Sequence, residues 1–161
     1  MEKKSLCADA CSLIYLYRCD ILRHAVRWYN FYTTPEILQE LSVKASGKEL
    51  QSYYNVTEVF HVPNTRTRKG LSSNDQSLID LFYQQRAYAV LSEDGKILQF
   101  CKKNQIQHFC SLSLICELVK KQEFSMDQAL LKLEFLIESG RYAPWVVQQA
   151  YSMLKESVAS I

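Results

Sequence analysis

The chain reads Cys7-Ala8-Asp9-Ala10-Cys11-Ser12-Leu13-Ile14 close behind its N-terminus. A short apolar run reaches a single aspartate here, and a helical pattern begins directly after it. If residues 6–8 end a buried strand, Asp9 lies at the carboxyl end of that strand, which is where open α/β sheets bind their ligands. Taken alone, Asp9 is better explained as a turn or helix-capping residue, so a functional role depends on other acidic residues.

Predicted strands and helices alternate along the chain. The strands are expected at residues 4–8, 31–33, 56–62, 87–91 and 106–110, and His61 is expected inside the third. Helical patterns separate them, while the polar residues 45–52 are expected to finish one helix and continue as a loop. This order is typical of a parallel sheet between two helical layers. We therefore expect a three-layer α/β/α sandwich with about five parallel strands, followed by C-terminal helices.

Length and composition limit the classes of protein to which the chain can belong. A chain of 161 residues that is 48% hydrophobic can bury a core as one folded unit. No run of about 18 apolar residues occurs, so no membrane span is predicted and a cytoplasmic protein is expected. The formal net charge of +2 does not by itself indicate a nucleic-acid partner.

The six cysteines are expected to be reduced and structural. No two of them have Cys-x-x-Cys spacing, and the three histidines are far apart in the sequence. Several of the cysteines lie in apolar runs, where a free cysteine behaves as a small buried hydrophobic residue. A disulfide framework and a zinc site are therefore both disfavoured.

Three further acidic residues, Glu40, Asp75 and Asp94, are expected at the same edge of the sheet as Asp9. Asp94 follows an apolar strand and precedes a helix, as Asp9 does. Two unit charges about 4 Å apart repel by roughly 4 kcal/mol at an effective dielectric constant of about 20. Four clustered carboxylates therefore need protons or a hard cation, and oxygen-only ligands suit Mg²⁺ or Mn²⁺.

Each of these residues also has a simpler structural explanation, or a competitor nearby. Asp75 has capping-box spacing from Ser72. Glu36, in the first turn of a helix that starts at Thr34-Pro35, complements the helix dipole, which leaves Glu40 less easily explained. The loop that contains Arg66, Arg68 and Lys69 is either solvated or, in a nuclease, a candidate for binding phosphates.

Four segments of the chain, at residues 8–14, 34–41, 71–75 and 90–94, together resemble the motifs of the PIN domain, the fold of many prokaryotic toxin nucleases. The resemblance covers roughly residues 3–115 and implies RNA cleavage with Mg²⁺ or Mn²⁺. By position it implies Asp9 as the first metal ligand, Glu40 as the second acid, Asp75 as the third and Asp94 as the fourth. Ser92 matches a small hydroxyl residue that often lies two positions before the fourth acid.

The resemblance leaves two positions in the acidic set open and adds expectations about partners. Glu40 is favoured over Glu36 because the family's acid is usually followed by leucine, and Glu93 competes with Asp94. Residues 119–161 resemble the C-terminal helical extension of one subgroup, packed on a PIN-like domain at residues 1–118. The family's toxins are silenced by a small antitoxin protein, and a homodimer is expected from the same resemblance.

The sequence thus predicts a metal-dependent endoribonuclease, with a catalytically inactive PIN-fold binding protein as the alternative. A phosphohydrolase with an aspartyl nucleophile is disfavoured, because such enzymes carry a second aspartate two residues after the first. Cys11 occupies that position.

Overall fold

A parallel five-stranded sheet forms the centre of the molecule in the computed structural model, which describes residues 2–63 and 67–159. Its strands are β1 (Lys4–Ala8), β2 (Tyr29–Thr33), β3 (Thr57–Val59), β4 (Ala89–Leu91) and β5 (His108–Phe109). They lie in the order β3-β2-β1-β4-β5, and every pair of neighbours is parallel. The expected parallel sheet of about five strands is confirmed.

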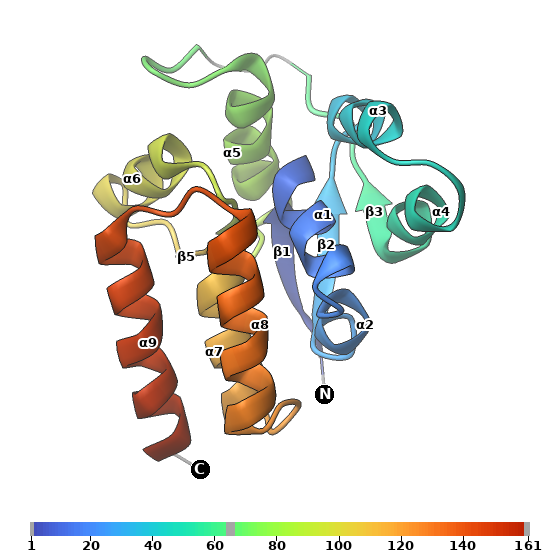
Figure 1. Cartoon of the computed structure of the whole chain (residues 1–161). Helices are drawn as coiled ribbons and strands as arrows, with labels where there is room; N and C mark the ends of the chain where they lie inside the picture. Colours follow the sequence, from blue (N-terminus) through green and yellow to red (C-terminus); the bar gives the residue numbers. More distant parts are fainter. Residues whose placement is uncertain (1, 64–66, 160–161) are drawn as a thin grey trace.

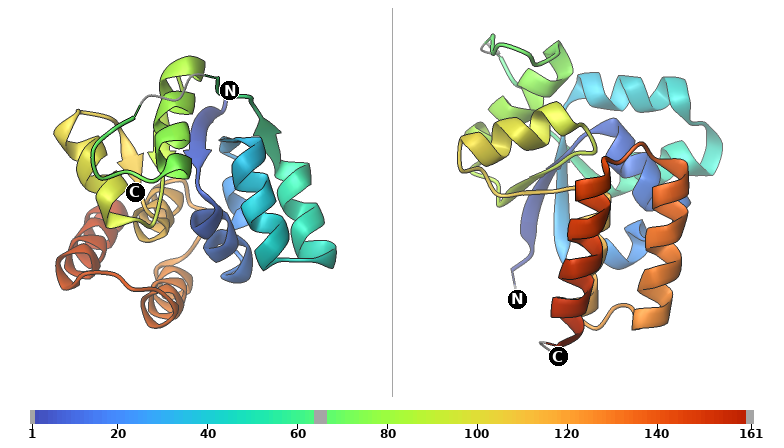
Figure 2. Two further views of the ribbon diagram at one scale, coloured as in Figure 1. Left: turned by 90° about the horizontal axis from the view of Figure 1, so that it is seen from above. Right: turned by 60° about the vertical axis from the view of Figure 1, so that its left-hand side comes forward.

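Helices cover both faces of this sheet (Figures 1 and 2). One layer contains α1 (Ala10–Arg18), α2 (Leu22–Ala25), α3 (Pro35–Lys44), α4 (Gly47–Val56) and α7 (Ser111–Lys120). The opposite face carries α5 (Ser73–Gln85) and α6 (Gly95–Lys103), and α8 (Met126–Ser139) and α9 (Pro144–Ala159) pack on α7. The expected three-layer α/β/α sandwich with C-terminal helices is therefore confirmed.

The central strand β1 fixes where a ligand site can form. Its last three residues, Leu6, Cys7 and Ala8, are fully buried, as expected for a parallel strand covered on both faces. β2 lies on one side of β1 and β4 on the other. The first three strands are therefore added toward one edge of the sheet and the last two toward the other edge. Ala8 pairs with Leu91 at the carboxyl ends of these two strands, where α/β sheets form their ligand crevice.

Two local predictions are wrong. Residues 45–52 do not loop away, because α4 runs from Gly47 to Val56 and packs through the fully buried Tyr53. The third strand is correspondingly shorter than residues 56–62, and His61 lies beyond its end rather than inside it. Tyr53 is the one fully buried side chain of this mostly polar helix, and the half-buried Leu50 and Val56 pack against the core beside it.

All six cysteines are free, as expected, and five of them are buried. Cys11 differs because it is exposed. Within residues 2–63 and 67–159, no helix is long and apolar enough to cross a membrane.

Candidate active site

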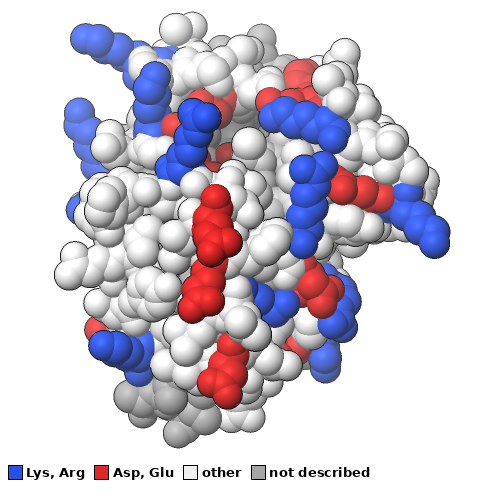
Figure 3. Space-filling view, viewed as in Figure 1, with Lys and Arg blue, Asp and Glu red and all other residues white. Residues whose placement is uncertain are grey.

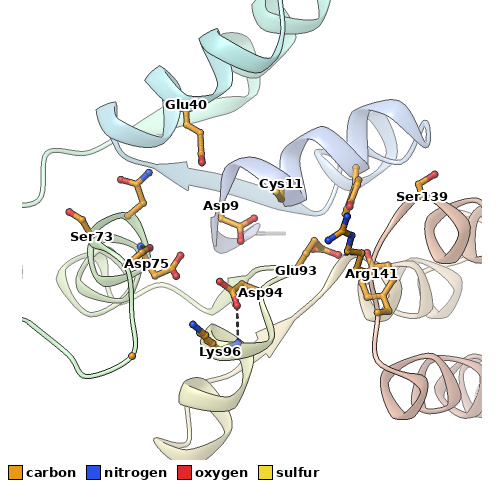
Figure 4. A pocket seen from close by; sticks show the side chains of 15 residues that line it. Asp9, Cys11, Glu40, Ser73, Asp75, Glu93, Asp94, Lys96, Ser139 and Arg141 are labelled. Atoms are coloured by element: carbon orange, nitrogen blue, oxygen red, sulfur yellow. Dashed lines mark hydrogen bonds between the residues drawn. The ribbon is translucent and has the colours of Figure 1, made fainter.

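A cavity of about 810 Å³ opens at the carboxyl ends of the strands (Figure 4). Five acidic residues line it, and these are Asp9, Glu40, Asp75, Glu93 and Asp94. In the space-filling view, acidic side chains lie in a hollow at the top of the molecule, and basic side chains stand around its rim (Figure 3). The structure thus brings together the four carboxylates predicted from the sequence and adds a fifth.

Asp9 is held at the floor of this cavity by donors from two elements. It is the N-cap of α1, and its Oδ1 accepts a hydrogen bond from the backbone N–H of Ser12 at 2.8 Å. Its Oδ2 accepts from the hydroxyl of the fully buried Ser92 at 2.5 Å. Burial raises the pKa of Asp9 despite these donors. Both explanations of Asp9 therefore apply, since the same carboxylate caps a helix and faces the cavity.

Glu93 is the most extensively hydrogen-bonded carboxylate of the site. Its Oε2 accepts from the Ser12 hydroxyl at 2.6 Å, and its Oε1 accepts from the Tyr142 hydroxyl at 2.5 Å. The backbone N–H of Ser111, at the start of α7, donates to both oxygens at 3.0 and 3.1 Å. Burial and then the charge of Asp9 raise the pKa of Glu93. Glu93 thus joins α1, α7 and the turn between α8 and α9.

Asp75 and Asp94 lie at the starts of the two helices on the opposite face. Asp94 is the N-cap of α6, where its Oδ1 accepts from the backbone N–H of Lys96 at 2.9 Å. Asp75 lies in the first turn of α5, which Ser72 caps, so the predicted capping role of Ser72 is confirmed. Burial raises the pKa of Asp75, and the charges of Asp94 and Asp9 raise it further. Asp9, Asp75 and Asp94 are therefore electrostatic neighbours.

Glu40 and Glu36 occupy different surroundings. The Glu40 side chain points from α3 toward the cavity and lies 3.6 Å from the ammonium group of Lys44 (Figure 4). Glu36 is exposed in the first turn of α3 and does not line the cavity. Of these two competing residues, Glu40 is the one that lies on the wall of the cavity.

A family model described as a PIN domain matches residues 5–156. The chain belongs to the PIN domain family. PIN domains are generally nucleases that act on nucleic acid and need a divalent metal ion. A search of curated proteins finds no match to this chain.

The basic residues around the active site of this PIN domain differ from the set expected from the sequence. Arg66 lies outside the described residues. Arg68 donates to Asp80 at 2.7 Å, and its side chain is only 15% exposed. Lys69 is exposed but does not line the cavity. The described basic residues that do line it are Lys96 and Arg141.

The acidic residues of the PIN domain suit a hard divalent cation by their chemistry. They offer only carboxylate oxygens, which Mg²⁺ and Mn²⁺ prefer. Burial is the main cause of the raised pKa of Asp75, and the charges of Asp94 and Asp9, which a cation would offset, raise it further. Within residues 2–63 and 67–159, no three Asp, Glu, His or Cys side chains are close enough together to form a complete metal site. The carboxylates thus face shared open space rather than a closed cage (Figure 4).

The cavity does not present an activated nucleophile. Cys11 lines it, but partial burial and then the charge of Asp9 raise the pKa of this thiol, and a nucleophilic cysteine needs a lowered one. None of the three histidines lines the cavity. Covalent catalysis by a cysteine–histidine pair is therefore not supported.

Proposed function

We propose that this PIN domain is a metal-dependent endoribonuclease that hydrolyses phosphodiester bonds of RNA in the cavity beyond β1 and β4. The observation that carries the proposal is the convergence of Asp9, Asp75 and Asp94 on one cavity, where burial and then the charges of Asp94 and Asp9 raise the pKa of Asp75. Aspartates that only stabilise the starts of helices do not need to lie close enough to repel one another. Such repulsion destabilises the folded protein unless a cation offsets it.

In this proposal Asp9, Asp75 and Asp94 hold Mg²⁺ or Mn²⁺, with Glu40 on the opposite wall. The bound ion supplies an activated water and stabilises the charge that develops on the phosphate. Glu93 is assigned a supporting role, because each of its two oxygens already accepts two hydrogen bonds, which fills the positions that a cation would need. Among the described residues the Oδ2 of Asp94 accepts no hydrogen bond, so Asp94 is the better ligand of the two.

The protein's own side chains orient the site and attract the substrate. Ser92 and the Ser12 backbone fix the Asp9 carboxylate, so its oxygens need little reorganisation to serve as ligands. Lys96 and Arg141 place positive charge beside the carboxylates, where a polyanion must enter. The Cys11 thiol takes no part, so the attacking group is a water molecule.

RNA is proposed as the substrate because the four motifs resemble those of RNA-cleaving members of the family. The same resemblance supports a small antitoxin protein as a partner and a homodimer as the assembly. These two proposals rest on the resemblance alone and are separate from the chemistry of the cavity. The cytoplasm is proposed as the location because the sequence has no apolar run long enough to span a membrane.

Cleavage of a labelled RNA of mixed sequence by the purified protein tests the nuclease. We expect cutting with Mn²⁺ or Mg²⁺, none with EDTA, and little cutting of a DNA of the same sequence. Asp75→Asn and Asp94→Asn should each reduce the rate at least about 100-fold, because even residues that only support metal ligands cost 10- to 100-fold.

Asp127→Asn is the matched control, since Asp127 is exposed in the first turn of α8 and does not line the cavity. Its rate should equal that of the unmodified protein. Folded protein that cuts no RNA with either metal ion would favour the alternative, a PIN-fold protein that binds without catalysis.

A further inference from the structure

The turn between α8 and α9 forms one wall of the cavity, although it is far in sequence from the four acidic motifs. Ser139, Arg141 and Tyr142 line the cavity, and Arg141 lies beside Glu93 (Figure 4). The turn lies at the same end of the molecule as the carboxyl ends of the strands (Figure 1). The C-terminal helices therefore contribute side chains to the site and do not only cover α7.

Two contacts fix the conformation of this turn. The Tyr142 hydroxyl donates to Glu93 at 2.5 Å, which ties the turn to the acidic wall. A Cβ atom at position 140 would lie 2.5 Å from Cε2 of Tyr142, so the ring packs directly against the backbone of Gly140. Arg141 is held between these two residues and has little freedom to move its backbone away from the cavity.

Arg141 differs from most other arginines of the described chain because it has no carboxylate partner. The arginines that do pair with a carboxylate are Arg18, Arg23, Arg27 and Arg68. Arg141 is exposed, lines a cavity with five acidic residues, and makes no ion pair or hydrogen bond with any residue that the structure describes. Its five N–H donors are therefore available to a ligand.

We propose that Arg141 is a substrate-binding residue, whose guanidinium binds a phosphate group of the RNA backbone next to the bond that is cut. This inference rests on the proposed nuclease function and names the residue that holds its substrate. An arginine fork matches two phosphate oxygens at once, which a lysine ammonium group does not. A phosphate contact positions the strand without selecting its sequence. Arg141 is thus added to Arg66, Arg68 and Lys69 as a candidate for binding phosphates.

Binding of a fluorescein-labelled single-stranded RNA, measured by anisotropy in EDTA, tests this role without metal and without cleavage. We expect Arg141→Gln to weaken binding roughly 10-fold, the usual effect of losing a charge-assisted hydrogen bond. The slope of log affinity against log salt should fall by about 0.7, the value for one phosphate contact on a single strand. Arg141→Lys should keep the salt slope and bind with intermediate affinity.

Lys155→Gln is the matched control, because Lys155 is exposed near the far end of α9. Removal of its charge should leave affinity and salt slope unchanged. Equal affinity and slope in Arg141→Gln and the unmodified protein, or no RNA binding by the unmodified protein at low salt, would overturn the inference. RNA that is bound through Arg141 but never cut with Mn²⁺ would instead refute the nuclease, and only the contact between Arg141 and a phosphate group would stand.

Discussion

At the scale of single residues, Asp9 combines a structural and a functional task that one substitution separates. Asparagine keeps the oxygen that caps α1 and removes the charge beside Glu93. Because burial raises the pKa of Asp9, its ionised form destabilises the folded protein when no metal is bound. We expect Asp9→Asn to abolish cleavage and to raise the free energy of unfolding in EDTA by on the order of 1 kcal/mol. Urea unfolding at neutral pH measures this change.

The same substitution has a pH dependence of definite sign. A carboxyl whose pKa is higher in the folded than in the unfolded state binds more protons when folded, so stability falls as pH rises between the two values. For Asp9 that fall begins near the unfolded pKa of about 3.9 and ends above the raised folded pKa. The advantage of Asp9→Asn should therefore grow across this window and then level off. A variant that is less stable than the unmodified protein at every pH would make Asp9 a structural cap alone.

The site residues that the sequence predicts are those whose position depends on local pattern. Asp9 and Asp94 directly follow apolar strands, and parallel strands end at one edge, so their proximity follows from the fold class. Arg141 and Tyr142 had no such signal, because Gly140 marks only the end of a helix and not where the next turn lies. Their position depends on how α8 packs on α7. The ion pair of Arg68 with Asp80, on the following helix, likewise had no signal in the sequence.

At the scale of elements, the α8–α9 turn depends on the absence of a side chain at Gly140. Its φ of −100° suits any residue, so the constraint is contact and not backbone conformation. An alanine Cβ would meet the Tyr142 ring and lie 3.0 Å from the carbonyl oxygen of Leu136. We expect Gly140→Ala to cost about 1–3 kcal/mol of stability, as overpacking does, and to weaken RNA binding by displacing Arg141.

Gly95→Ala is the matched control for this prediction. Nothing lies within 4 Å of a Cβ built on Gly95, the first residue of α6. A compatible glycine-to-alanine change stabilises a protein by about 0.4–1 kcal/mol through the unfolded chain. Urea unfolding of both variants distinguishes the effect of the steric contact at position 140 from the effect of alanine on the entropy of the unfolded chain. If Gly140→Ala were as stable as Gly95→Ala, the ring of Tyr142 would not be packed against the turn.

Strands and helices could be predicted where the apolar periodicity or a capping residue is clear. They could not be predicted where a mostly polar helix depends on tertiary contacts. β1 was predicted with its exact bounds, and Ser72 caps α5 at the spacing noted in the sequence. α4 was missed because Tyr53 is its only fully buried side chain and polar residues surround it. Tertiary contact decides such a helix, and the sequence of the segment alone does not contain that information.

At the scale of the whole molecule, the C-terminal segment contacts the rest of the chain both before α8 and along α9. Glu123, between α7 and α8, accepts from Trp28 Nε1 at 2.9 Å and lies 3.1 Å from His24 Nδ1. Ala150 and Leu154 of α9 are buried, and the Cys116 thiol of α7 lies 3.4 Å from the Ala150 carbonyl oxygen. We therefore propose that residues 119–161 belong to one cooperative unit with residues 1–118.

The two tryptophans report on that unit separately, because Trp28 precedes β2 and Trp145 lies in α9. In Trp28→Phe, Glu123 loses a hydrogen-bond donor, and we expect a loss of stability of about 1–3 kcal/mol. If the chain unfolds as one unit, the remaining fluorescence of Trp145 must shift to the same lower urea midpoint as the circular dichroism signal. Trp145→Phe should show coincident midpoints with Trp28 as the reporter. The alternative is that the fluorescence of Trp145 changes at a lower urea concentration than the circular dichroism signal and is not shifted by Trp28→Phe. That result would mean that α9 unfolds independently and that Arg141 belongs to a segment that can unfold separately.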